Sequence, residues 1–125
     1  MDLGALADED YCYLTTRGRV TGRAHEIEIW FALEGSTLYI LSGGGDRTDW
    51  VRNIWRNPET TVRIGDSTFA GRGRLVDETG EDELARKLLF EKYQPRFGGD
   101  LTRWRGYALS VAVDLDGPAE EIRSR

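Results

Sequence analysis

The sequence has very little of the residue types that build disulfides, metal sites and membrane spans. Its 125 residues include one cysteine, Cys12, and one histidine, His25, so an internal disulfide cannot form and no Cys/His cluster predicts a metal. No apolar run is long enough for a transmembrane helix, and the N-terminal MDLGALADEDY is too acidic for a signal peptide. We therefore expect a soluble cytoplasmic protein with no metal and no membrane partner.

Positive charge is also scarce, because 22 acidic residues outnumber 17 basic ones and give a formal net charge of −5. This balance argues against general nucleic-acid binding, so no nucleic-acid partner is expected. The stretch TTRGRVTGR, residues 15–23, is an exception with three arginines and no acid. A local cluster of this kind suits a small anion better than a polyanion.

The hydrophobic pattern predicts one domain over residues 1–125, with a core from about 11 to 115 and a polar tail at 116–125. Alternating and β-branched runs predict six strands, and apolar residues at helical spacing predict two to three helices. The strands are expected at residues 11–16, 26–33, 37–42, 60–64, 67–76 and 107–115, and the two clearest helices end before Pro58 and near Tyr93. This order favours a mainly β, α+β fold, a six-stranded antiparallel barrel that is closed or nearly closed and has its helices outside.

Two glycines interrupt the fifth predicted strand. Gly71 and Gly73 share a face with Phe69, while Arg72 and Arg74 point the other way. Glycine inside a strand indicates strong coiling or a close neighbour. We expect the glycine face to lie against another part of the protein.

Two loops at strand ends combine features that bind anions. In the first, Arg19 and Arg23 offer paired donors and Thr21 adds a hydroxyl. The second is SGGGDR, residues 42–47, where glycines expose backbone N–H groups and Arg47 adds a charge before a helix. Each loop alone is more often an ordinary solvated turn, but both flank the same strand pair and could converge. Their spacing matches neither a P-loop nor G-x-G-x-x-G.

No nucleophile–base pair is recognisable, so the catalytic residues stay unassigned and a cofactor would supply the chemistry. His25 is more often a surface or phosphate-contacting residue than a lone catalytic acid. Trp50 and Trp55 fall on a helix stripe and are expected to pack. Trp30 faces away from its neighbours and Trp104 precedes the last strand, where either could cover a flat ligand.

Three stretches together resemble the deazaflavin (F420)-dependent nitroreductase and quinone reductase family: TTRGRVTGRAHEIEIWF, LYILSGGGDRTDWVRNIWRNPETTVRIG and GYALSVAVDL. The resemblance covers roughly residues 11–115, and its most specific parts are the T-T-x-G-R-x-T-G turn, the glycine loop and the W-x-x-N helix. This family belongs to the split β-barrel flavin-binding superfamily. The resemblance implies a six-stranded split barrel with a cofactor groove.

The resemblance also implies F420 as cofactor and hydride transfer from its reduced form to a quinone, nitro compound or similar small acceptor. The cofactor-binding residues expected from the anion-binding pattern and the resemblance are Arg19, Thr21, Arg23, His25, Trp30, Ser42, Gly43, Gly44, Gly45, Arg47, Trp50 and Asn53. Gly43 and Val20 stand where the family commonly has basic residues.

Two alternatives stay open. The chain could be an FMN-binding split-barrel flavoprotein, because FMN needs fewer basic contacts, or a non-catalytic binding protein for a small ligand. The superfamily often forms dimers and this family includes monomers, which leaves a homodimer open.

Overall fold

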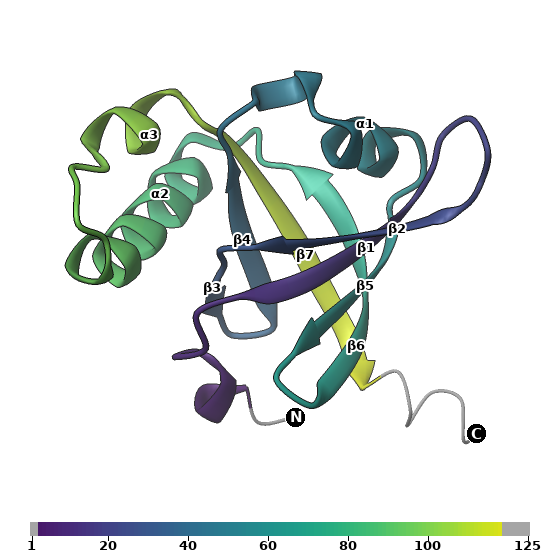
Figure 1. Ribbon diagram of the computed structural model, residues 1–125, viewed down its shortest axis with the longest axis horizontal. Helices are drawn as coiled ribbons and strands as arrows, with labels where there is room; N and C mark the ends of the chain where they lie inside the picture. Colours follow the sequence, from purple (N-terminus) through teal and green to yellow (C-terminus); the bar gives the residue numbers. More distant parts are fainter. Residues whose placement is uncertain (1–2, 119–125) are drawn as a thin grey trace.

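The computed structural model describes residues 3–118 (Figure 1). Within them, one seven-stranded antiparallel sheet with the order β2-β1-β5-β6-β7-β4-β3 curls into a split barrel. The strands are β1 Cys12–Arg17, β2 Ala24–Ile29, β3 Ala32–Glu34, β4 Thr37–Ser42, β5 Glu59–Ile64, β6 Ser67–Leu75 and β7 Leu109–Pro118. The helices are α1 Asp49–Arg56, α2 Thr79–Tyr93 and α3 Thr102–Tyr107, with short 3-10 turns η1 Gly4–Leu6, η2 Gly45–Arg47 and η3 Gln94–Arg96.

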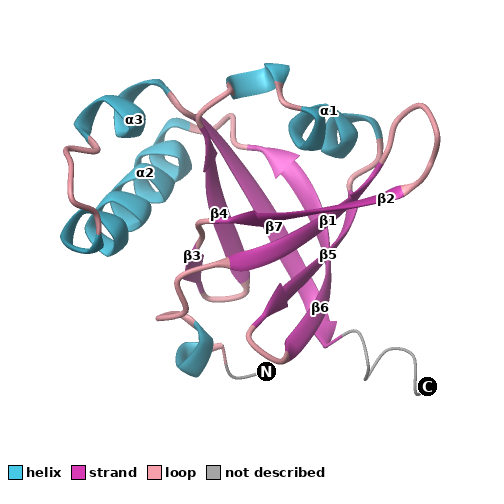
Figure 2. Cartoon of the chain, in the orientation of Figure 1, coloured by secondary structure: helices cyan, strands magenta, loops and turns pink. Residues whose placement is uncertain are grey.

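The helices lie outside the sheet (Figure 2). Helices α2 and α3 pack together on one side, and α1 lies beside the long turn between β1 and β2. No helix within residues 3–118 is long and apolar enough to span a membrane.

The predicted fold class is confirmed, with one strand more than expected. The prediction of a single strand over residues 26–33 is wrong, because β2 ends at Ile29 and β3 begins at Ala32. Strand β2 pairs with β1 at one edge of the sheet, whereas β3 pairs with β4 at the other edge. Between them the N–H of Phe31 donates to the hydroxyl of Tyr93 at 3.0 Å, a side chain of α2. The backbone therefore leaves one edge of the sheet and joins the other at this step, while the two edge strands stay unpaired with each other.

The last strand also runs further than predicted. Strand β7 continues to Pro118, and Gly117 and Pro118 pair with β6. Residues 116–118 therefore belong to the sheet and not to the predicted polar tail. The rest of that tail, residues 119–125, lies outside the described residues.

Two hydrophobic clusters lie on opposite faces of the sheet, because neighbouring residues of a strand point to opposite sides. In β4, Leu38 and Ile40 join the cluster inside the barrel, whereas Tyr39 and Leu41 join the cluster under α2. Cys12 is fully buried in the first cluster, as expected, and burial raises the pKa of its thiol to about 12. This thiol stays protonated at neutral pH and has little nucleophilic character.

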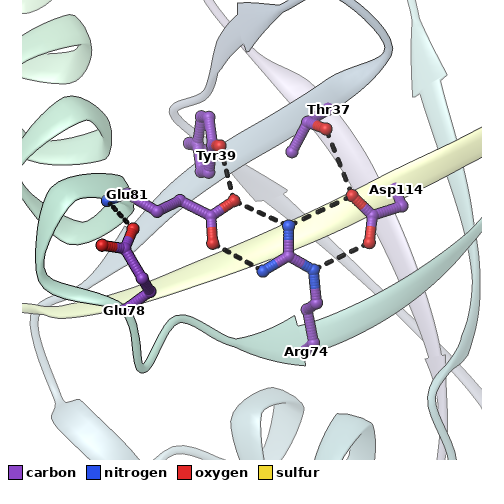
Figure 3. Close-up of polar contacts among 6 residues, drawn as sticks. All are labelled: Thr37, Tyr39, Arg74, Glu78, Glu81 and Asp114. Atoms are coloured by element: carbon purple, nitrogen blue, oxygen red, sulfur yellow. Dashed lines mark hydrogen bonds and ion pairs between the residues drawn. The ribbon is translucent and has the colours of Figure 1, made fainter.

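A charge network attaches the start of α2 to the outer face of the sheet (Figure 3). Arg74 donates to both carboxylate oxygens of Glu81 at 2.7 Å and to those of Asp114 at 2.8 and 3.3 Å. Tyr39 donates to Glu81 at 2.7 Å and Thr37 donates to Asp114 at 3.1 Å. The guanidinium holds the pKa of Glu81 down to about 2 and lowers the pKa of Asp114.

Replacing Arg74 with glutamine is expected to lower the free energy of unfolding at pH 7 by about 1–2 kcal/mol, a value reduced for partial solvent exposure. The folded-state pKa of Glu81 lies below its ordinary value of 4.5. The stabilisation in the parent is therefore present above pH 4.5 and is lost as the pH falls to about 2. Urea unfolding at several pH values should show a gap between parent and variant that narrows in acid.

The control for this network is Arg72→Gln, since Arg72 is exposed on the same outer face of β6. It should leave the free energy of unfolding within about 0.5 kcal/mol of the parent's at each pH. A gap for the Arg74 variant that is the same at neutral and acid pH would contradict the linkage to Glu81 and Asp114.

Candidate functional site

The turn between β1 and β2, residues 18–23, is held by its own backbone. The N–H of Gly18 donates to the carbonyl of Arg23 at 2.7 Å, and the N–H of Gly22 donates to the carbonyl of Gly18 at 2.8 Å. Gly22 has φ +74°, a conformation that glycine adopts without strain. A Cβ on Gly18 would lie 2.9 Å from Nε2 of His25. The two glycines therefore let the turn fold back closely against the imidazole.

Asn53 of α1 connects this turn to the barrel. Its side chain is buried, and its Nδ2 donates to the hydroxyl of Thr16 at 3.1 Å. Its Oδ1 accepts from the backbone N–H of Arg19 at 3.2 Å and from the guanidinium at 3.0 Å. The other terminal nitrogen of Arg19 lies 3.2 Å from a carboxylate oxygen of Asp49. These contacts fix the guanidinium from the helix side and leave 30% of its side chain exposed.

The turn and α1 enclose a groove of about 630 Å³, called the turn groove below. Half of the predicted cofactor-binding residues line it, namely Arg19, Thr21, Arg23, His25, Trp50 and Asn53. Within residues 3–118, the guanidinium of Arg23 forms no ion pair. Its charge is therefore available to an anionic ligand in the groove.

A second space of about 320 Å³, called the aromatic pocket below, lies at the far end of β2. It is lined by Tyr11, Glu28, Ile29, Trp30, Leu41, Gly43 and Trp104. The indole of Trp30 stacks on the ring of Tyr93, with centroids 4.4 Å apart and planes 3° apart, and Trp104 meets its edge at 5.5 Å. Residues 24–27 line the turn groove, and residues 28–30 line the aromatic pocket. The two spaces are therefore lined by consecutive stretches of β2 and the residue after it.

The glycine loop belongs to the aromatic end of this strand and not to the turn. Gly43 lines the aromatic pocket. Ser42 is buried, and its hydroxyl donates to the carbonyl of Gly45 at 2.9 Å. Gly44, Gly45 and Arg47 line neither the turn groove nor the aromatic pocket. None of the glycine-loop residues 42–47 therefore lines the turn groove, and the two predicted anion-binding loops do not line one shared space.

The predicted packing role of Trp55 is wrong, because 69% of this residue is exposed. The buried residues of α1 are Val51, Asn53 and Ile54, and Trp50 is partly buried against the barrel core. Successive helix positions are separated by about 100°. Trp55 consequently falls on the flank of α1, beyond the side that meets the sheet.

Trp104 lines the aromatic pocket, as its place before the last strand indicated, and two tyrosines that the sequence did not assign to a site lie beside it. Tyr93 follows the apolar stripe of α2 and reads as a core residue, yet its ring supports Trp30. Trp104 and Tyr107 of α3 lie over the glycine loop, and a Cβ on Gly43 would be 3.8 Å from each side chain. The available signal was their spacing of three residues, which places two aromatic side chains on one side of a helix.

The family model for F420H2-dependent quinone reductases matches residues 3–115. The chain belongs to this family. F420-dependent reductases are oxidoreductases, so the family, the enzyme class and the cofactor predicted from the sequence are confirmed. A comparison with curated proteins found no match.

Solved structures with the same fold include an F420-H2 dependent reductase, which is 20% identical over 83% of this chain and 93% of that chain, with a TM-score of 0.69. A structure described as a domain-swapped dimer is 20% identical over 83% of this chain and 79% of that chain, with a TM-score of 0.68. An FAD-binding protein from Mesorhizobium loti is 16% identical over 90% of this chain and 84% of that chain, with a TM-score of 0.65. At these identities the likeness establishes the fold alone.

Proposed function

We propose that this member of the family is an F420H2-dependent reductase that transfers a hydride to a quinone, a nitro compound or a similar small acceptor. The observation that carries the proposal is the arrangement along β2, where two arginines line one space and aromatic rings line the next. The turn groove is also lined by Asp49 and Glu26, and Arg19 is paired with Asp49. Among residues 3–118, the unpaired positive charge of this groove is therefore that of Arg23. A cofactor with a phosphate-bearing tail and a flat ring is arranged in the same way, with charge at one end and an aromatic system at the other. It can therefore lie along the strand with its charge in the turn groove and its ring toward the aromatic pocket.

The turn groove is suited to the anionic part of this cofactor. Arg19 and Arg23 donate charge-assisted hydrogen bonds to phosphate oxygens in this proposal, and the hydroxyl of Thr21 and the ring of His25 border the same groove. Asn53 keeps the guanidinium of Arg19 oriented before the ligand arrives, which reduces the ordering cost of binding.

The aromatic end is suited to the ring. When bound in its reduced form, F420 supplies the hydride. Gly43 has no side chain and leaves room for a ring to approach the loop, while Trp30 and Trp104 border the space. Ser42, Gly44, Gly45 and Arg47 are proposed to shape the loop beside the ring, and Trp50 to line the path between the two ends. The acceptor takes its proton from water or from a neighbouring donor such as the hydroxyl of Tyr107.

Titration with F420 tests the proposal, followed by the fluorescence of the tryptophans that line both spaces. We expect saturable quenching at micromolar F420, and oxidation of F420H2 when menadione or a nitroaromatic compound is added. Absence of binding at micromolar F420 would contradict the proposal. Binding without reduction of any of several quinones and nitro compounds would instead favour a non-catalytic binding protein.

The small number of free cations keeps FMN as a second candidate cofactor. Gly43 and Val20 add no charge, and Arg19 already shares its charge with Asp49. Fewer positive groups therefore face the ligand than a multiply anionic tail could engage. This alternative predicts a yellow protein on purification, and a colourless protein that ignores added FMN excludes it.

We also propose a homodimer as the assembly to test. A similar solved structure is a domain-swapped dimer, and in this chain β2 and β3 are the two edges of the sheet. Edge strands carry unpaired backbone groups that a second copy can pair with. Light scattering after gel filtration should give twice the mass of the chain, and the mass of one chain would exclude the dimer at that concentration.

A further inference from the structure

The peptide of Phe31, between β2 and β3, is held by side chains at the end of α2. Its N–H donates to the hydroxyl of Tyr93 at 3.0 Å, and its carbonyl accepts from Nζ of Lys92 at 3.0 Å. The hydroxyl of Tyr93 also lies 2.9 Å from the carbonyl oxygen of Asp10 and 3.1 Å from that of Phe31, either of which can accept its single proton. The backbone N–H and the backbone carbonyl of Phe31 are thus both hydrogen-bonded, although no strand pairs with this residue.

Tyr93 also supports the neighbouring Trp30. The two rings are parallel within 3° at a centroid distance of 4.4 Å, and the edges of Phe97 and Trp104 meet the indole at 5.8 and 5.5 Å. Tyr93 is only 2% exposed, and burial raises the pKa of its phenol, so the hydroxyl keeps its proton at neutral pH. One face of the indole is therefore fixed, and this determines how Trp30 forms a wall of the aromatic pocket.

We infer that Tyr93 is a positioning residue for the reaction: it acts through Trp30 and holds the indole in the orientation that receives a planar, uncharged acceptor ring. The inference rests on the proposed function, since it assigns the acceptor to the pocket that Trp30 borders. The ring of Tyr93 sets the plane of the indole, and its hydroxyl sets the main chain of the next residue. A side chain that merely filled space could support the indole, but it would not hold the backbone of Phe31 through hydrogen bonds.

Three variants separate the ring, the hydroxyl and general stability. Tyr93→Phe keeps the stack and loses the hydroxyl, whereas Tyr93→Leu loses both. Leu89→Val is the matched control, because Leu89 is fully buried one turn earlier on the same side of α2 and does not bond to the Phe31 peptide. Each protein is labelled with 5-fluorotryptophan for ¹⁹F NMR, and the resonance of Trp30 is assigned by its loss in Trp30→Phe.

Menadione is the acceptor probe in two measurements. Its binding to cofactor-free protein is followed by tryptophan quenching, and its KM and kcat are measured with F420H2. We expect Tyr93→Leu to weaken menadione binding about threefold to tenfold and to raise KM by a similar factor. The affinity for F420 should fall less than that for menadione, because the turn groove still holds the anionic tail of the cofactor, and the Trp30 resonance should move while that of the exposed Trp55 does not.

Tyr93→Phe should fall between the parent and Tyr93→Leu, and it carries the test if Tyr93→Leu does not fold. Leu89→Val should lower the thermal stability of the protein. It should nevertheless change neither menadione binding nor the Trp30 resonance. Equal weakening by Leu89→Val, or parental menadione affinity in both Tyr93 variants, overturns the inference. Failure of the parent to bind F420 would refute the proposed function alone, because menadione binding and the Trp30 resonance still decide the role of Tyr93.

Discussion

An Arg19→Ala variant is expected to bind F420 about 10- to 100-fold more weakly than the parent, the loss of one or two charge-assisted hydrogen bonds. The guanidinium lines the turn groove in a position fixed by Asn53 and Asp49. The fold should survive, because the backbone N–H at position 19 keeps its bond to Asn53 and the side chain of Asp49 is 85% exposed. The fluorescence titration measures the affinity, and thermal unfolding verifies the fold.

Arg17→Ala is the matched control for this experiment. Arg17 carries the same charge two residues earlier, but it is exposed, does not line the turn groove, and contacts the turn only through a long 3.4 Å hydrogen bond to the carbonyl of Gly22. Its loss should reduce affinity by about twofold at most, through screened long-range attraction. Equal losses in both variants would show a general effect of charge, and full affinity in Arg19→Ala would remove this residue from the site.

A Gly73→Val variant is expected to lose about 3 kcal/mol of unfolding free energy, which corresponds to roughly 10 °C in Tm for a domain of this size. A Cβ on Gly73 would lie 2.8 Å from Cγ2 of Ile54 and 3.0 Å from its Cδ1. Helix α1 therefore rests on β6 at a position where no side chain fits. Valine should push α1 outward together with Trp50 and Asn53, so F420 affinity should fall as well.

Two further variants connect this loss to the contact between α1 and β6. Shortening the opposing side chain with Ile54→Ala in the Gly73→Val background should restore part of the stability, as a positive coupling in a double-mutant cycle. Gly98→Ala is the neutral control, because a Cβ there has no neighbour within 4 Å and the backbone φ is not positive. Additive losses from the Gly73 and Ile54 changes would contradict the steric explanation.

Patterns among near neighbours in the chain predicted much of the fold. The strand predicted at residues 37–42 is β4, and the helix predicted to end near Tyr93 is α2, whose buried residues Ala85, Leu89 and Tyr93 recur at helical spacing. The glycines of β6 indicated a close neighbour, and the structure identifies it as Ile54 for Gly73 and Val113 for Gly71. These features depend on strand and helix periodicity, which adjacent residues determine.

The cationic half of the candidate site was also visible in the sequence. Three arginines around two glycines predicted an anion-binding turn, and the W-x-x-N motif pointed to Asn53 before any contact was known. The structure brings Arg19, Arg23 and Asn53 together in the turn groove, whereas Arg17 lies outside it. Whether they bind the cofactor stays a prediction that the Arg19 experiment tests.

The sequence by itself determined the split-barrel class, the family and the arginine turn, because each is encoded in local periodicity or in a short motif. Only the tertiary structure decided that no strand pairs with Phe31, that Tyr93 supports Trp30, and that Gly43 lines the aromatic pocket. The physical reason is distance along the chain. The Phe31 peptide is satisfied by a hydroxyl 62 residues later, and no local pattern shows that its hydrogen bonds will come from a helix rather than from a strand.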